Sequence, residues 1–137
     1  KLNNLIDKIN KEYLKSIIFK KLEKHKNVHR IYRKYDLHVF GSMCESFGII
    51  ILETIASSLP IVCSNFPVFK EILGKYTLYF DANNSDSISK CIKNYLHNNN
   101  LKIKNTKKLF MAAKKFTWKT TTDKTFNFII KQYEKSI

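Results

Sequence analysis

Short apolar runs alternate along this chain with stretches of helical periodicity, and this alternation constrains the fold most. Apolar residues at helical spacing predict helices near 2–14, 23–34, 48–58, 68–73, 85–95, 101–115 and 118–135. Short apolar runs predict strands at 37–40, 60–63 and 78–80. Periodicity alone leaves 2–22 open between one long helix and a helix followed by a strand at 16–19. Strands alternating with helices indicate a parallel α/β sheet, whose ligands bind beyond the carboxyl ends of the strands.

Several residues carry signals for where helices stop and start. Gly74 is expected to end the helix at 68–73, because glycine readily takes the backbone conformation that closes a helix. Ser85 is expected to cap the helix at 85–95, and the three asparagines at 98–100 are expected to interrupt it.

Two carboxylates, Glu45 and Glu53, have seven residues between them and lie in the loop and the helix expected within 37–58. The loop from 41 to 47 leads into that helix, whose first backbone N–H groups have no partner within the helix. Such groups and the positive end of the helix dipole attract anions such as phosphate. Glu45 would lie at the mouth of this site and Glu53 about 7 Å further along the helix axis. This spacing indicates a site for a ligand with both charged and hydroxyl groups.

Five neighbouring segments match the motifs of one known family. The segments are 31–40 ("lyr-x-aD-x-fv"), 53–62 ("EAmAcGlPVv"), 64–74 (ending "lpEilg"), 78–81 ("glyfdp") and 116–118 ("FsW").

Together with the E-x7-E spacing of Glu45 and Glu53, these segments resemble the retaining, GT-B-fold glycosyltransferases of group 1. The resemblance covers residues 16–135 and is most specific over 36–81. It favours a strand at 16–19 after the first helix. Gly41 stands where the family has a proline, Ser58 where it has a glycine, and Lys20 and Lys21 where a glycine usually follows the strand near Phe19.

The resemblance implies a role for each residue of the motif. Ser46, Phe47, Gly48 and Ile49 would bind the donor, with the N–H groups of the last three holding sugar hydroxyls and diphosphate. Glu53 would accept hydrogen bonds from the ribose. Glu45 would lie near the sugar ring and stabilise the charge that develops at its anomeric carbon.

The resemblance also implies the organisation of the protein. Residues 1–137 are expected to be a single nucleotide-sugar-binding domain with a Rossmann-like parallel sheet, an incomplete C-terminal half of a GT-B fold. The acceptor, a glycan or a lipid-linked molecule, would bind through an N-terminal domain absent here. Donor and acceptor are substrates, and no metal or other cofactor is expected.

Net charge is the main argument for another class of protein. At +14 the chain could be a non-enzymatic basic module that binds nucleic acid or an anionic membrane. Arg30 and Arg33 are its only arginines, however, and the lysines are spread from Lys1 to Lys135. Because bidentate contacts to bases and phosphates rely on arginine, we expect a solvated lysine surface and no specific nucleic acid partner. Peripheral contact with an anionic membrane remains open.

Composition places the chain in the cytoplasm, with a position on the inner membrane face as an option. At 137 residues and 44% hydrophobic it is one domain or part of one, with no apolar run long enough to span a bilayer. Cys44, Cys63 and Cys91 form no C-x-x-C pair and are expected to be small buried thiols. His25 and His29 are four residues apart without a third ligand at suitable spacing, so solvent-facing or partly buried histidines are expected.

Overall fold

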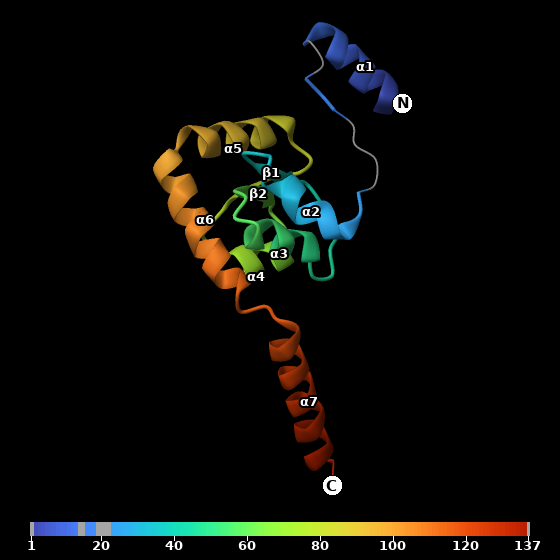
Figure 1. Cartoon of the computed structure of the whole chain (residues 1–137), viewed down its shortest axis with the longest axis vertical. Coiled ribbons are helices and arrows are strands. Elements are labelled where there is room, and N and C mark those ends of the chain that lie inside the picture. Colours follow the sequence, from blue (N-terminus) through green and yellow to red (C-terminus); the bar gives the residue numbers. More distant parts are fainter. Residues whose placement is uncertain (1, 14–15, 19–22, 137) are drawn as a thin grey trace.

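A computed structural model of the chain describes residues 2–13, 16–18 and 23–136 (Figure 1). Its helices are α1 (Leu2–Glu12), α2 (His25–Tyr32), α3 (Ile49–Ala56), α4 (Pro67–Leu73), α5 (Ser85–His97), α6 (Asn99–Ala113) and α7 (Trp118–Glu134). Its strands are β1 (His38–Phe40), β2 (Ile61–Ser64) and β3 (Leu78–Phe80).

The three strands form a parallel sheet in the order β1-β2-β3. Each connection crosses over through a helix, α3 between β1 and β2 and α4 between β2 and β3, because parallel neighbours cannot be joined by a tight turn. All four residues of the central strand β2 are buried, as expected for a parallel strand covered on both faces. The predicted α/β class with a parallel sheet is confirmed.

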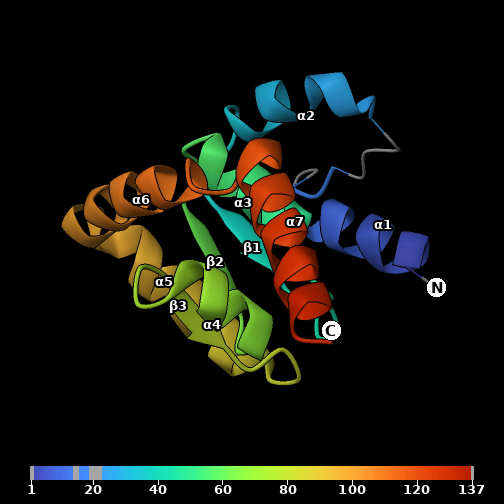
Figure 2. The same ribbon diagram turned by 90° about the horizontal axis from the view of Figure 1, so that it is seen from below.

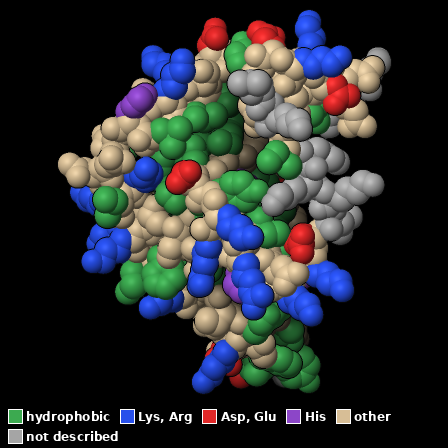
Figure 3. All heavy atoms as spheres, turned by 45° about the horizontal axis from the view of Figure 1, so that its top comes forward, with side chains coloured by type: hydrophobic (Ala, Val, Ile, Leu, Met, Phe, Trp, Pro, Cys, Tyr) green, Lys and Arg blue, Asp and Glu red, His purple; other side chains and the backbone are tan. Residues whose placement is uncertain are grey.

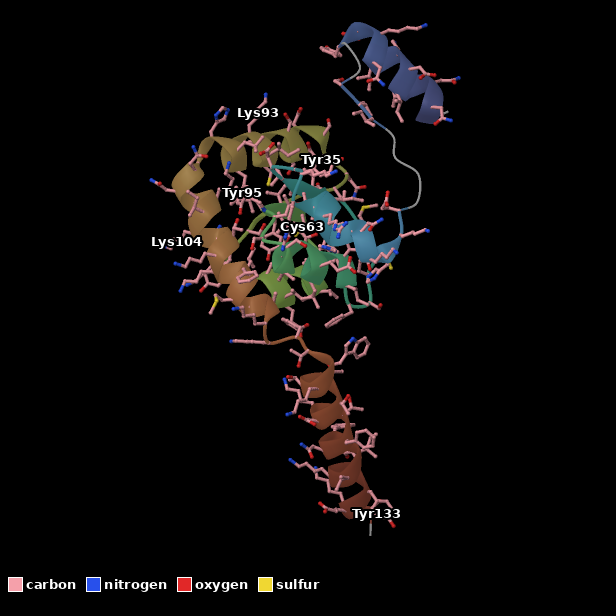
Figure 4. The ribbon with its side chains drawn as sticks, viewed as in Figure 1. Tyr35, Cys63, Lys93, Tyr95, Lys104 and Tyr133 are labelled. Atoms are coloured by element: carbon pink, nitrogen blue, oxygen red, sulfur yellow. The ribbon has the colours of Figure 1, made fainter. Side chains whose placement is uncertain are left out.

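Alternate residues of β2 point into two separate parts of the core. Ile61 and Cys63 lie in a cluster built from α3, α4 and α6, which includes Ile51, Ile55, Phe69 and Leu109. Val62 lies on the other face with Phe80, Cys91 and Tyr95, the last two from α5. Figure 2 shows the strands running between these helices, and in Figure 4 Cys63 and Tyr95 lie inside the body. The sheet is therefore held between helices on both faces.

The cysteine prediction is correct for two residues and wrong for the third. Cys63 and Cys91 are buried free thiols, and burial raises the pKa of both, that of Cys63 to about 12. Cys44 is exposed, because it belongs to the loop after β1 and not to a strand or a core-facing helix position.

Helix ends agree with the sequence signals except at α5. Gly74 ends α4 with φ at 54°, and its N–H donates to the Lys70 carbonyl oxygen. Asn84 caps α5, because its side-chain oxygen accepts hydrogen bonds from the N–H groups of Asp86 and Ser87. The prediction of Ser85 as the cap is therefore wrong by one residue. Asn98 separates α5 from α6 and caps the latter.

The strand expected at 16–19 does not form over 16–18, and Phe19 lies outside the described residues. Ile17 instead pairs with the Asn10 side chain, which donates to the Ile17 carbonyl oxygen and accepts from its N–H, both at 2.7 Å. A side-chain amide thus takes the backbone groups that a neighbouring strand would have used.

The last helix, α7, extends away from the body of the protein (Figure 1). None of its residues is buried, and Trp118 is 87% exposed. Trp118 therefore lies outside the core. Among the described helices, none combines the length and apolar character needed to cross a bilayer.

Ser58 closes α3 in a conformation that normally selects glycine. Its φ is +58°, its N–H donates to the Ile55 carbonyl oxygen, and the N–H of Leu59 donates to that of Thr54. These two bonds define a Schellman motif, in which the residue at the position of Ser58 adopts left-handed backbone angles. A side chain in this region is strained, whereas glycine is not.

We therefore expect Ser58→Gly to raise the free energy of unfolding by up to about 1 kcal/mol. Thermal unfolding followed by circular dichroism measures the effect. Ser57→Gly is the matched control, because Ser57 has φ at −84° and gains nothing from glycine. An unchanged or lower melting temperature for Ser58→Gly would show that relief of strain at this turn does not limit stability.

Candidate functional site

The site begins at Gly48, the residue that precedes α3. Its φ is +80° and ψ 52°, angles that a residue with a side chain adopts only with strain. A Cβ here would stand 3.6 Å from side-chain atoms of Ile51 and Phe69, which is ordinary contact. Backbone conformation, and not space, therefore requires glycine at this turn from the loop into the helix.

The turn leaves a row of backbone donors without partners. Among the described residues, the N–H groups of Phe47, Gly48, Ile49 and Ile50 donate no hydrogen bond. Gly48 provides no side-chain cap. The next element after β1 is α3, which begins after the loop at 41–48. Free donors at the positive end of a helix dipole can bind an anionic group.

Glu45 lies in the loop that leads to these donors. Its side chain is half-buried, and it makes no hydrogen bond or ion pair with any residue that the structure describes. The same loop is held to the end of β2, because the Ser64 hydroxyl donates to the Ser42 carbonyl oxygen. Glu45 is therefore an unpaired carboxylate on an anchored loop.

Glu53 lies on the second turn of α3, on the same side as Ile49 and about 6 Å further along the axis. Its Oε1 is 2.7 Å from Nε2 of His25 on α2. The Glu53 side chain is 27% exposed and that of His25 88%, so the pair lies at the surface and stabilises the fold little. The expectation that His25 faces solvent is confirmed.

A groove of about 350 Å³ between α2 and α3 opens beside Glu53. The residues lining it are His25, Lys26, Val28, His29, Tyr32, Arg33, Glu53, Ala56 and Ser57. The lining mixes ring side chains with cationic ones around one carboxylate. Such a groove can hold a flat or hydroxyl-bearing molecule next to Glu53.

Polar groups beneath the groove support α3 at the position of Glu53. Thr54 is buried, and its hydroxyl donates to the Ile50 carbonyl oxygen at 2.8 Å. It therefore accepts from Nδ1 of His38 on β1, at 2.7 Å, because a hydroxyl has one hydrogen to give. Burial lowers the pKa of His38, which favours the neutral ring. These bonds join β1 to α3.

Tyr32, also on α2, lies beside the same turn of α3. Burial raises the pKa of Tyr32, and the nearby charge of Glu53 adds to this effect. Tyr32 and His25 are seven residues apart on α2, so they lie on the same face of that helix, the one next to Glu53. The side chains that lie beside Glu53 therefore come from α2.

A second hollow, of about 300 Å³, lies at the carboxyl ends of the strands. Met43 from the loop after β1 lines it together with residues that follow β2 and β3, including Asn65, Asp81 and Asn83. The Asp81 carboxylate accepts a hydrogen bond from the Asn83 N–H at 2.9 Å. Amide and carboxylate groups beside an apolar side chain are suited to binding hydroxyl-rich molecules.

Phe47 joins the site loop to the far end of the chain. Its ring contacts that of Phe116, in the link between α6 and α7, with centroids 6.1 Å apart. Both side chains remain partly exposed. The aromatic pair places the start of α7 next to the loop that carries Glu45.

The residues predicted from the sequence come together in one region. Ser46, Phe47, Gly48 and Ile49 form the turn into α3, with Glu45 just before it and Glu53 one turn beyond Ile49. His25, Tyr32, Asn65 and Asp81 were missed as neighbours of the site. The signal for Asn65 and Asp81 was their place directly after strands. No cluster of three or more metal-ligating side chains occurs among the described residues.

Comparison with known proteins identifies the family. The family model for glycosyl transferases group 1 matches residues 1–116, so the chain belongs to this family. The chain is 35% identical over 89 residues to O-antigen chain mannosyltransferase B from Escherichia coli, which covers 65% of this chain and 23% of the relative. It is 38% identical over 64 residues to O-antigen chain mannosyltransferase RfbU from Salmonella typhimurium, covering 47% of this chain and 18% of the relative.

A solved structure shows the same fold. Sucrose-phosphate synthase from Thermosynechococcus elongatus superimposes with a TM-score of 0.79 over 97% of this chain and 35% of its own, at 15% sequence identity. The predicted assignment to part of a GT-B fold is therefore confirmed. The chain spans less than a quarter of the length of the two curated relatives described above.

Proposed function

We propose that this chain is the nucleotide-sugar-binding part of a retaining glycosyltransferase, which transfers a sugar to a glycan or lipid-linked acceptor. The observation that carries the proposal is the unpaired Glu45 carboxylate beside the free N–H groups of Phe47 to Ile50. Family membership supports sugar transfer, and the position at the carboxyl ends of parallel strands supports ligand binding there.

In this proposal α3 binds the diphosphate of the donor. The free N–H groups and the helix dipole supply positive charge at the place where the leaving diphosphate gains negative charge. For this reason we expect transfer without a metal ion. The groove beside Glu53 would take the nucleoside, with Glu53 accepting hydrogen bonds from the ribose.

Glu45 would act on the sugar itself. A carboxylate near the anomeric carbon stabilises the positive charge that develops there as the bond to diphosphate breaks. The hollow next to Asn65 and Asp81 adjoins the loop of Glu45, so we assign it to sugar hydroxyls of the donor or acceptor. The rest of the acceptor site would lie on a separate N-terminal domain. The free thiols Cys63 and Cys91 fit a cytoplasmic setting.

Hydrogen exchange with a bound nucleotide tests this proposal. Guanosine or uridine diphosphate is expected to slow exchange at the amides of Phe47 to Ile50, because these N–H groups would be bonded to phosphate oxygens. The exchange is followed by mass spectrometry with and without nucleotide. As a control, adenosine without phosphate should leave these amides unchanged.

Protection restricted to the lysine-rich helices α5 and α6 would contradict the proposal. Together with affinity for random-sequence DNA that weakens steeply with salt, that result would favour a basic binding module.

A further inference from the structure

We propose that the outward face of α6 binds the surface of an anionic phospholipid bilayer. This inference is independent of the proposed sugar transfer, because it rests on other residues and needs no nucleotide. It concerns the exposed side chains Ile103, Lys104, Lys107, Lys108 and Met111, here called the α6 face.

Charge is separated along the sequence in a way that points to α5 and α6. Residues 87–122 contain nine lysines and no aspartate or glutamate, so they supply nine of the fourteen net positive charges. The lysines are Lys90, Lys93, Lys102, Lys104, Lys107, Lys108, Lys114, Lys115 and Lys119. In the structure most of this stretch forms α5 and α6, which lie on the outside of the body and meet at an angle, and its last residues begin α7 (Figure 1).

Helix geometry divides α6 into two opposite stripes. Asn105, Leu109 and Ala113 are buried and recur every four residues. Ile103, Lys107 and Met111 recur in the same way, about 160° around the helix axis from the buried stripe. Ile103 is 66% exposed and Met111 54%, although both are apolar. Figure 4 shows Lys104 pointing away from the body.

A groove of about 380 Å³ continues this surface on the side of the turn before β2. It is lined by Ser58, Pro60, Lys102, Ile103, Thr106, Lys107 and Phe110. The Lys114 ammonium group stands 5.0 Å from the centroid of the Phe110 ring. Apolar side chains and ammonium groups thus alternate over α6 and its border. Figure 3 shows a similar mixture of green apolar and blue basic side chains over the face in view.

A bilayer surface fits both parts of this pattern. Apolar side chains such as Ile103 and Met111 can enter the boundary between headgroups and acyl chains, while neighbouring lysines extend to the phosphates. Each lysine close to an anionic surface adds favourable free energy, and no carboxylate on α6 opposes it. Nucleic acid would use the lysines but not the exposed Ile103 and Met111, and the face has no arginine for bidentate phosphate contacts.

Vesicle flotation of the full chain tests the proposal. The chain should float with vesicles of phosphatidylglycerol and phosphatidylcholine but not with phosphatidylcholine alone. The triple variant Lys104→Glu, Lys107→Glu, Lys108→Glu should partition onto the anionic vesicles at least about 100-fold less. The matched control is Lys34→Glu, Lys70→Glu, Lys75→Glu, which changes the net charge equally at exposed positions outside α6 and should lose less than about tenfold.

The apolar part is tested by Ile103→Ser with Met111→Ser, which keeps every charge. The unchanged chain should keep part of its vesicle binding in about 0.5 M salt, where charge attraction is screened. The double serine variant should lose the binding that persists at this salt concentration. Equal losses in the two lysine triples, or no flotation with anionic vesicles, would overturn the proposal. So would binding to single-stranded DNA that matches vesicle binding in strength and is lost in the same α6 variant.

Discussion

Replacing Glu45 with glutamine is expected to lower the rate of sugar transfer by at least about a hundredfold while nucleotide affinity hardly changes. Glutamine keeps the size and shape of the side chain but removes its charge. Glu45 is half-buried and makes no hydrogen bond or ion pair with the described residues, so the fold does not depend on this carboxylate. Its loss should act on the transition state, where positive charge develops on the sugar.

The measurement compares transfer and nucleotide binding with this chain joined to an acceptor-binding domain. Glu134→Gln on α7 is the control, because it makes the same change at an exposed position on the helix that extends from the body. If Glu45→Gln weakened nucleotide binding as strongly as transfer, the carboxylate would act on the ground state. Unchanged transfer would remove Glu45 from the catalytic site.

Periodicity and strand alternation predicted most of the fold because they report local burial. β2 reads as a continuous apolar run and is buried on both faces, and Gly74 ends α4 as expected. The predictions failed where a side chain binds backbone groups that the apolar pattern does not report. Asn84, and not Ser85, caps α5. The Asn10 side chain makes hydrogen bonds with the backbone N–H and carbonyl groups of Ile17, so no strand forms there.

The candidate site was predictable where it lies within one continuous segment. Glu45, the turn at Gly48 and Glu53 follow from a strand, a loop and a helix in immediate succession. The partner of Glu53 was not predictable from the sequence. His25 is 28 residues away in sequence and reaches Glu53 only when α2 packs on α3. The contact between Phe47 and Phe116 has the same cause. The spread of lysines from Lys1 to Lys135 likewise did not indicate that Lys104, Lys107 and Lys108 share the exposed face of α6.

Replacing Glu53 with alanine is expected to weaken binding of both the nucleoside diphosphate and the nucleotide-sugar by about 1.5 to 3 kcal/mol, which is the contribution of a hydrogen bond to a charged group. This corresponds to roughly a 10-fold to 150-fold rise in Kd. The ion pair with the exposed His25 is lost too, but it contributes little to stability, so the variant should fold.

Isothermal titration calorimetry of the chain with a nucleoside diphosphate, for Glu53→Ala beside the exposed control Glu134→Ala, is the most direct test that the donor binds between Glu45 and Glu53. The Kd is expected to rise at least about tenfold for Glu53→Ala and to stay unchanged for the control. Equal affinities for the two variants and the unchanged chain would contradict it.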